Sequence, residues 1–190
     1  MLLCAFPAAG QETPADEGES VVYAYALGDQ VLSISLGPLV PLFNMAFDGA
    51  FSGTNLTLGG TGSIAWAAYL TDAIRVGAEI GGVFAFSRPN WNTLLMLPIM
   101  ARAEYVLSFY PFEVPISLGV GMNIVKYEDQ KNIDLLIRPG VSGFWAYDSK
   151  WSFGVNLAWW VDLQFYPDNW DDARIGNFLS VTVSALYHYQ

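Results

Sequence analysis

Residues 74–86 read Ile-Arg-Val-Gly-Ala-Glu-Ile-Gly-Gly-Val-Phe-Ala-Phe, and this stretch decides the fold. Its even-numbered positions are mostly large and apolar, whereas its odd-numbered positions carry the charges of Arg75 and Glu79 among Gly, Ala and Val. Successive side chains of a β-strand point to opposite faces, so an alternation of period two indicates a strand with one apolar face. No helical stripe of comparable length competes with this pattern.

The same alternation recurs along the chain in segments of the length expected for tilted strands that cross a membrane. At positions 151–165, for example, Trp, Phe, Val and Leu alternate with Ser, Gly, Asn and Asp. The pattern predicts eight strands, at 31–43, 55–70, 74–86, 93–107, 113–126, 133–147, 151–165 and 175–189.

The composition calls for an apolar surrounding. The chain has 190 residues, a length that suits one domain, of which 53% are hydrophobic and 14% charged, where soluble domains average about 25% charged. No stretch approaches the roughly 20 apolar residues that a membrane helix needs. A membrane would therefore be crossed by strands.

The types of side chain on the two faces of the strands indicate which face points inward. An eight-stranded barrel has room inside for little beyond its own side chains, and the face rich in Gly and Ser is also the one that carries charges. The bulky face must then point outward. The alternative, a soluble lipocalin-like barrel, would expose that apolar band to water. We predict an all-β fold, an eight-stranded antiparallel up-and-down transmembrane β-barrel.

The connections between strands alternate in length and give the barrel a direction. Tight turns at 71–73, 108–112 and 148–150 are typical of the periplasmic side, and longer connections at 44–54, 87–92, 127–132 and 166–174 form the outer side. Aromatic residues near the two rims predict two interfacial girdles, with Tyr110, Trp151, Tyr187 and Tyr189 on the turn side and Trp91, Phe165 and Tyr166 on the loop side.

Two prolines are difficult to reconcile with this assignment of strands. Pro98 and Pro139 lie inside predicted strands, where each removes a ladder donor, and a closed barrel has no free edge to accommodate them. We expect a local bulge at each.

The N-terminus resembles the end of a secretory signal. Residues 1–10 are apolar and end in small residues, although a basic region is missing. We expect 1–10 to be a truncated signal peptide, 11–29 a periplasmic segment and 30–190 the barrel. A short apolar N-terminus and lipidation at Cys4 are the alternatives.

The predicted lumen holds charges of both signs in equal number, namely Arg75, Glu79, Arg102, Glu104, Arg138 and Asp162. Buried charges require partners, and strand pairing sets Glu79 opposite Arg102, Glu104 diagonal to Arg75, and Arg138 diagonal to Asp162. The network is either a plug or gate in a conduit or a permanent polar core. Further inward residues either outline a path or fill space, and filling is the preferred interpretation: Phe43, Asn123, Phe144, Asn156, Trp160 and Leu186.

Catalysis, metal binding and nucleic-acid binding find little support. His188 is the only histidine and lies near the turn-side rim, with Ser184 the nearest inward hydroxyl. We expect no enzyme activity, no cofactor and no metal, and we treat the acidic loop with Asp168, Asp171 and Asp172 as solvated. The formal charge of −10 disfavours nucleic acid.

Some stretches resemble a known group of proteins. Gly28-Asp29-Gln30-Val31-Leu32-Ser33-Ile34, running to Gly37-Pro38 and Pro41-Leu42-Phe43, and then Leu97-Pro98-Ile99 before Arg102 and Tyr105, resemble small spirochaete-type outer-membrane barrels of the OmpW-like or OmpA-like kind. The resemblance covers residues 28–190. OmpW-like members imply passage of small hydrophobic molecules, whereas OmpA-like members imply envelope integrity, host contact or immune exposure.

The resemblance also implies where the protein resides and what it meets. It implies the bacterial cell outer membrane, outer-membrane lipid around the barrel, and the barrel assembly machinery, which reads a terminal aromatic such as Tyr189, although Gln190 departs from the usual closing Phe. The first hypothesis is a narrow pore or conduit for small solutes, including hydrophobic ones. The alternative is a closed structural or surface-exposed barrel that contacts a host component and transports nothing.

Overall fold

The structure, a computed structural model, describes residues 25–87, 92–127, 130–164 and 173–189. These residues form the following strands: β1 (Gln30–Ala46), β2 (Phe51–Ser52), β3 (Gly59–Tyr69), β4 (Ile74–Phe86), β5 (Thr93–Phe109), β6 (Phe112–Tyr127), β7 (Gln130–Ala146), β8 (Trp151–Gln164) and β9 (Arg174–Tyr189).

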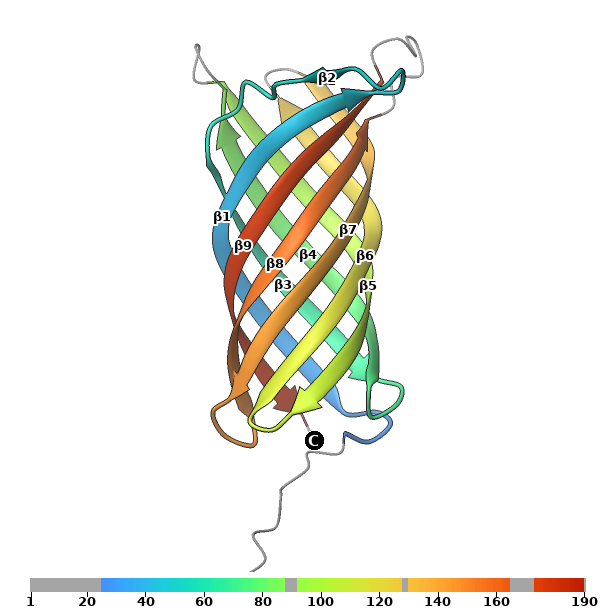
Figure 1. Cartoon of the computed structure of the whole chain (residues 1–190), viewed down its shortest axis with the longest axis vertical. Helices are drawn as coiled ribbons and strands as arrows, with labels where there is room; N and C mark the ends of the chain where they lie inside the picture. Colours follow the sequence, from blue (N-terminus) through green and yellow to red (C-terminus); the bar gives the residue numbers. More distant parts are fainter. Residues whose placement is uncertain (1–24, 88–91, 128–129, 165–172, 190) are drawn as a thin grey trace, which may run out of the picture.

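The strands close into a barrel (Figure 1). Every long strand pairs antiparallel with its neighbour in the chain, and β9 pairs back onto β1 from Gln30↔Tyr189 to Ala46↔Arg174. The two-residue β2 only adds to the loop end of β1, through Asn44↔Ser52. The barrel wall therefore has eight strands, and the predicted all-β, up-and-down fold is confirmed.

Burial follows the alternation in the sequence. On β4, Ile80 and Phe84 are 50% and 52% exposed, whereas Arg75 and Glu79 are 2% and 3% exposed. Large apolar side chains are exposed on the outer face of all the wall strands, the reverse of a protein whose outer face meets water. Among the described residues, no helix is long and apolar enough to cross a membrane.

Several strand boundaries differ from the prediction: β1 extends to Ala46 and β5 to Phe109, beyond the expected ends at 43 and 107. The strand expected at 55–70 begins at Gly59: Asn55 has a φ of 51°, outside the extended conformation, and Leu56 forms only an isolated bridge to Ser87. At the next loop-side connection, β6 and β7 extend to Tyr127 and Gln130, which pair with each other beyond the expected ends at 126 and 133.

The prolines do not cause the expected bulges. Pro98 on β5 pairs with Asn123 on β6, and Pro139 on β7 pairs with Leu118 on β6. On the other side of each proline, the pairing of β5 with β4 and of β7 with β8 is interrupted, but the register is the same before and after the gap. A missing N–H affects only one of the two neighbouring strands, so the ladder continues past it.

The bulge lies in β1, between Pro41 and Phe43. It shifts the register by one residue, so Phe43 lies on the outer face and not on the predicted lumen face. There the centroid of its ring is 6.4 Å from that of the exposed Trp159. The inward placement of Phe43 was therefore wrong.

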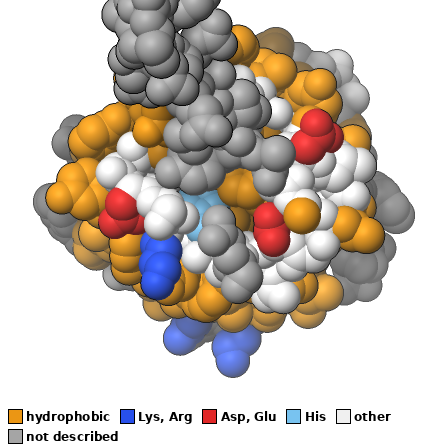
Figure 2. Space-filling view, turned by 90° about the horizontal axis from the view of Figure 1, so that it is seen from below, with side chains coloured by type: hydrophobic (Ala, Val, Ile, Leu, Met, Phe, Trp, Pro, Cys, Tyr) orange, Lys and Arg blue, Asp and Glu red, His pale blue; other side chains and the backbone are white. Residues whose placement is uncertain are grey.

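The two ends of the barrel differ. Tight turns at 70–73, 110–111 and 147–150 lie at one end, together with the C-terminus (Figure 1). Seen from this end, apolar side chains surround the edge with a few charged side chains among them (Figure 2). The Tyr187 ring lies 4.9 Å from Trp151 and 4.8 Å from Tyr189, and Tyr110 is also exposed here. The four aromatic residues predicted for the turn-side girdle thus lie at this end, and their place at a membrane interface stays a prediction.

Several predictions fall on residues outside the described ranges. These are the signal peptide at 1–10, Cys4, the loop-side aromatics Trp91, Phe165 and Tyr166, and the acidic residues Asp168, Asp171 and Asp172.

Close approach of β3 and β4 gives a test of the packing. A Cβ added to Gly77 would lie 1.8 Å from the Trp66 carbonyl oxygen, whereas one added to Gly82, on the same strand, meets nothing within 4 Å. Gly77→Ala should therefore lower the unfolding free energy by about 1–3 kcal/mol, measured by urea titration of the protein refolded in detergent micelles. Gly82→Ala, the matched control, should leave stability unchanged or raise it. Equal stabilities of the two variants would contradict this packing.

Candidate functional site: the charged lumen

The six charged residues predicted for the lumen all lie on the inner face. Arg75, Glu79, Glu104, Arg138 and Asp162 are buried. Arg102 is the least buried of the three lumen arginines, with 16% of its side chain exposed against 2% for Arg75 and 10% for Arg138.

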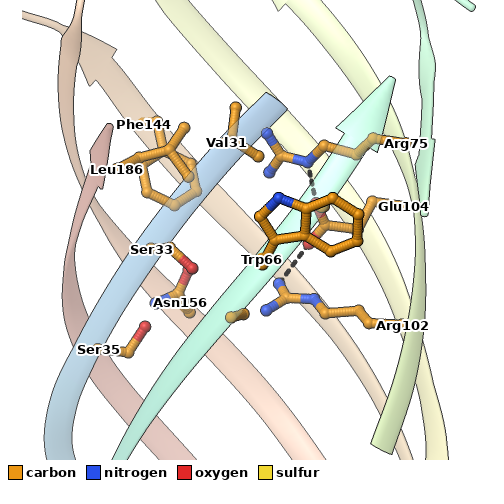
Figure 3. A pocket seen from close by; sticks show the side chains of 12 residues that line it. Val31, Ser33, Ser35, Trp66, Arg75, Arg102, Glu104, Phe144, Asn156 and Leu186 are labelled. Atoms are coloured by element: carbon orange, nitrogen blue, oxygen red, sulfur yellow. Dashed lines mark hydrogen bonds and ion pairs between the residues drawn. The ribbon is translucent and has the colours of Figure 1, made fainter. Parts of the chain in front are cut away.

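Five of these side chains form one continuous ion network across the middle of the barrel. Arg102 lies at its centre: Nη1 donates to Glu79 Oε2 at 3.0 Å, and Nη2 lies 2.5 Å from Glu104 Oε1. Glu104 also accepts from Arg75, and Glu79 also accepts from Arg138. Figure 3 shows the part of this ion network that Arg75, Glu104 and Arg102 form. Each charge of this five-residue network thus has at least one partner of opposite sign.

The register of β4 on β5 differs from the predicted one by two residues. Arg75 is directly opposite Glu104, and Arg102 is opposite Gly77, so the contact of Glu79 with Arg102 is diagonal. The ladder closes at Phe86↔Thr93, which displaces β5 along β4. The predicted partners meet, but the direct and diagonal pairs are exchanged.

Arg138 does not pair with Asp162, contrary to the prediction. Its guanidinium reaches across the lumen to Glu79 and lies 5.0 Å from the centre of the Trp160 ring. Asp162 instead accepts a hydrogen bond from Asn123 Nδ2 at 3.1 Å. Pairing rules between neighbouring strands miss such contacts, because a narrow barrel brings opposite walls within reach of an arginine.

Two acidic residues of the lumen were missed by the sequence analysis. Glu113 and Asp134 are 5% and 2% exposed. Their parity within β6 and β7 is that of Ser117 and Arg138, which would have placed both inward. The described lumen therefore holds five acidic residues (Glu79, Glu104, Glu113, Asp134 and Asp162) against three arginines, and the predicted balance of charge was wrong.

Aromatic rings close the turn end. Tyr25, which precedes β1, stacks on Tyr69 with centroids 4.2 Å apart and on His188 at 5.5 Å, and its hydroxyl donates to Glu113 Oε1. Burial, with the nearby Glu113 carboxylate as a second cause, raises the pKa of the Tyr25 phenol, so it remains a neutral donor. His188 Nε2 lies 3.1 Å from Ser152 Oγ, so Ser152 rather than Ser184 is its hydroxyl partner.

The other predicted lining residues fill the lumen above and below the network. Phe144 and Leu186 belong to a turn-side apolar cluster with Val31 and Tyr69. Trp160 belongs to a loop-side cluster and donates from Nε1 to Ser180 Oγ at 2.9 Å. Asn156 donates to Thr182 Oγ1 at 2.9 Å and to Ser184. Asn123 is fully buried near the loop end.

Two small cavities remain between these layers. One, of about 20 Å³, is lined by Arg75, Arg102, Glu104 and Asn156 among others, and the second, of about 30 Å³, by Glu79, Arg102, Arg138 and Asn156 among others. Volumes of this size hold about one or two water molecules each. Ser35, Arg102 and Asn156 line both cavities, so these three side chains lie between the two spaces.

Clusters of metal-binding side chains are not found in the part of the chain that the structure describes, where no three His, Cys, Asp or Glu residues come together.

Relatives of the chain occur in two spirochaetes. A protein-family model matches residues 11–187, which include nearly the whole barrel. An uncharacterized protein of Borreliella burgdorferi is 25% identical over 177 residues, covering 82% of this chain and 81% of the relative. One of Treponema pallidum is 26% identical over 202 residues, covering 99% and 91%.

Solved structures with the same fold are small outer-membrane barrels. Neisserial surface protein A superposes with a TM-score of 0.63 and 8% identity over 85% of this chain and 97% of its own. OprG of Pseudomonas aeruginosa gives 0.51 and 12% over 86% and 97%. The attachment invasion locus protein Ail of Yersinia pestis gives 0.50 and 10% over 86% and 100%. These matches agree with the expected fold of a small outer-membrane barrel.

The shared ion network predicts strong coupling between Glu79 and Arg102. Glu79→Ala leaves Arg138 without its carboxylate partner, and Arg102→Ala removes one of the two cations that Glu79 and Glu104 each contact. Each variant alone should lower the unfolding free energy by about 3 kcal/mol. The double variant should lose less than the sum by about 1–3 kcal/mol, measured by urea titration in micelles. Lys126→Ala, which removes an outward-facing charge, should be additive with Glu79→Ala. Additive losses for Glu79 and Arg102 would rule out the contact.

Proposed function

The chain belongs to the family whose model matches residues 11–187, and we propose that it is an integral outer-membrane protein with a narrow conduit that Arg102 closes at rest. The exposed apolar band supports the membrane location, because it suits a lipid surrounding and is a liability in water. The fold it shares with outer-membrane proteins supports the same choice.

The barrel's direction is part of the proposal. The tight turns and the C-terminus face the periplasm, and the longer connections face outward, as in other barrels of this type. Outer-membrane lipid surrounds the apolar band, and the assembly machinery recognises the last strand with Tyr187 and Tyr189.

One observation carries the conduit: two cavities share a boundary of three side chains, of which Arg102 is the largest and the only charged one. Arg102 lines both, and its guanidinium is held by a carboxylate on each side, Glu79 and Glu104. A change of the Arg102 rotamer would join the two spaces without any movement of the wall. Arginine has four side-chain torsions, and this one is the least buried of the three, so it has space to change rotamer once its two ion pairs break.

The lining defines the class of solute. Ser, Thr, Asn, Glu and Arg line most of the larger cavity, whereas the apolar clusters on either side are filled by their own side chains. We therefore propose water and small polar or ionic solutes. The route for hydrophobic molecules implied by the OmpW-like resemblance would need an apolar space instead.

A second candidate function is a closed barrel that supports the envelope or contacts a host surface. The paired charges of the middle and the Tyr25 stack at the turn end favour it, because both stabilise a filled lumen. Neither candidate is an enzyme: the Ser152 and His188 pair is buried next to Tyr25, and catalysis is not part of the proposal.

Single-channel recording in planar bilayers separates the two candidates. Wild-type protein should show rare, small openings, and Arg102→Ala should open several-fold more often or with larger conductance, because the cavities join. Lys126→Ala is the matched control: it also removes one positive charge, but from the outer face, and should behave as wild type.

Heat-modifiable migration on gels would verify that each variant is folded. A folded Arg102→Ala protein that stays silent would overturn the conduit and leave the closed barrel.

A further inference from the structure

A second polar group lies on the loop side of the ion network. It consists of Asn123 on β6, Asp134 on β7 and Asp162 on β8, three neighbouring strands. Asn123 is directly opposite Asp134, and Asp162 is opposite Leu136, so the two carboxylates are diagonal neighbours on one face. Their side chains are almost completely buried, with 0%, 2% and 0% of Asn123, Asp134 and Asp162 exposed.

The carboxylates have no basic partner. The ion pairs formed by the described residues involve only Arg75, Arg102 and Arg138 with Glu79 and Glu104. A buried carboxylate without a counter-charge is strongly unfavourable, so it either takes up a proton or binds a cation.

Two oxygen atoms of the group have no hydrogen-bond donor. Asn123 Nδ2 donates to Asp162 Oδ1 at 3.1 Å, which leaves Asn123 Oδ1 and Asp162 Oδ2 buried and unpartnered. Asp134 Oδ1 accepts from Asn132 Nδ2. Unpartnered acceptors in a fully buried site are rare, and a cation would satisfy both at once.

We propose that Asn123, Asp134 and Asp162 bind a calcium ion inside the loop end of the barrel. The donors are all oxygen atoms, the set that hard cations prefer, and two carboxylates neutralise one divalent ion. Diagonal neighbours lie about 7–8 Å apart in the backbone, so their carboxylates can converge on an ion with bonds of about 2.4 Å. Mg²⁺ is disfavoured because it demands near-ideal octahedral geometry at about 2.0–2.1 Å and usually retains several waters, whereas Ca²⁺ accepts irregular sets of carboxylate and amide oxygens.

Terbium luminescence tests the site directly, since Tb³⁺ substitutes for Ca²⁺ and is excited through a nearby tryptophan. Trp160 lies two residues from Asp162 on the same face of β8 and is 1% exposed. Folded protein in micelles should give sensitised emission that saturates at one ion per chain, and CaCl₂ should displace it more readily than MgCl₂. Asp162→Asn and Asp134→Asn should each weaken binding more than about tenfold.

Asp72→Asn, an exposed acid in a turn at the opposite end, is the matched control and should bind as wild type. A second measurement needs no variant: CaCl₂ should raise the unfolding midpoint of wild-type protein relative to EDTA.

Two results would overturn the proposal. Emission that is unchanged in Asp162→Asn would place the bound ion elsewhere. Absence of saturable emission, with a midpoint insensitive to CaCl₂, would mean that the carboxyls are protonated instead. Neither readout depends on conductance, so the site stands or falls separately from the conduit.

Discussion

Arg102 is held between Glu79 and Glu104 because a narrow closed barrel leaves its inward side chains no other way to satisfy their charges. Every second residue of each strand points into a space that contains room for only a few waters. Small residues admit the long arginines, and the arginines in turn join strands on opposite walls. The interior network and the apolar exterior are therefore two consequences of one alternation.

Charge is distributed unevenly along this interior. The middle holds the three arginines of the ion network, the turn end holds Glu113 in contact with Tyr25, and the loop end holds Asp134 and Asp162 without a basic partner. The neutral Tyr25 phenol donates to the acid at the turn end, and a cation is our proposal for the loop end. Each end thus requires a different means of stabilising an acid, whereas the middle is stabilised by its own ion pairs.

Much of this arrangement could be predicted from the sequence. The alternation alone predicts the strands, their two faces and the inward charges, because a period of two fixes the face of every residue once one face is known to be buried. The same parity would have identified Glu113 and Asp134 as inward residues. Three features escaped it. Phe43 faces outward because of a one-residue bulge, Arg138 crosses the lumen to Glu79, and Tyr25 enters the barrel from outside the strands. All three depend on the closed three-dimensional shape, which neighbour-by-neighbour pairing does not describe.

The central claim is that the Arg102 guanidinium is immobilised between two carboxylates and closes the lumen. Nitrogen-15 NMR of arginine side chains in micelles tests it most directly, with Arg102→Lys used to assign the signal. We predict separate Nη signals for Arg102 that exchange slowly with water and show contacts to the Glu79 and Glu104 methylenes. A single averaged signal in fast exchange with water, without those contacts, would contradict the account.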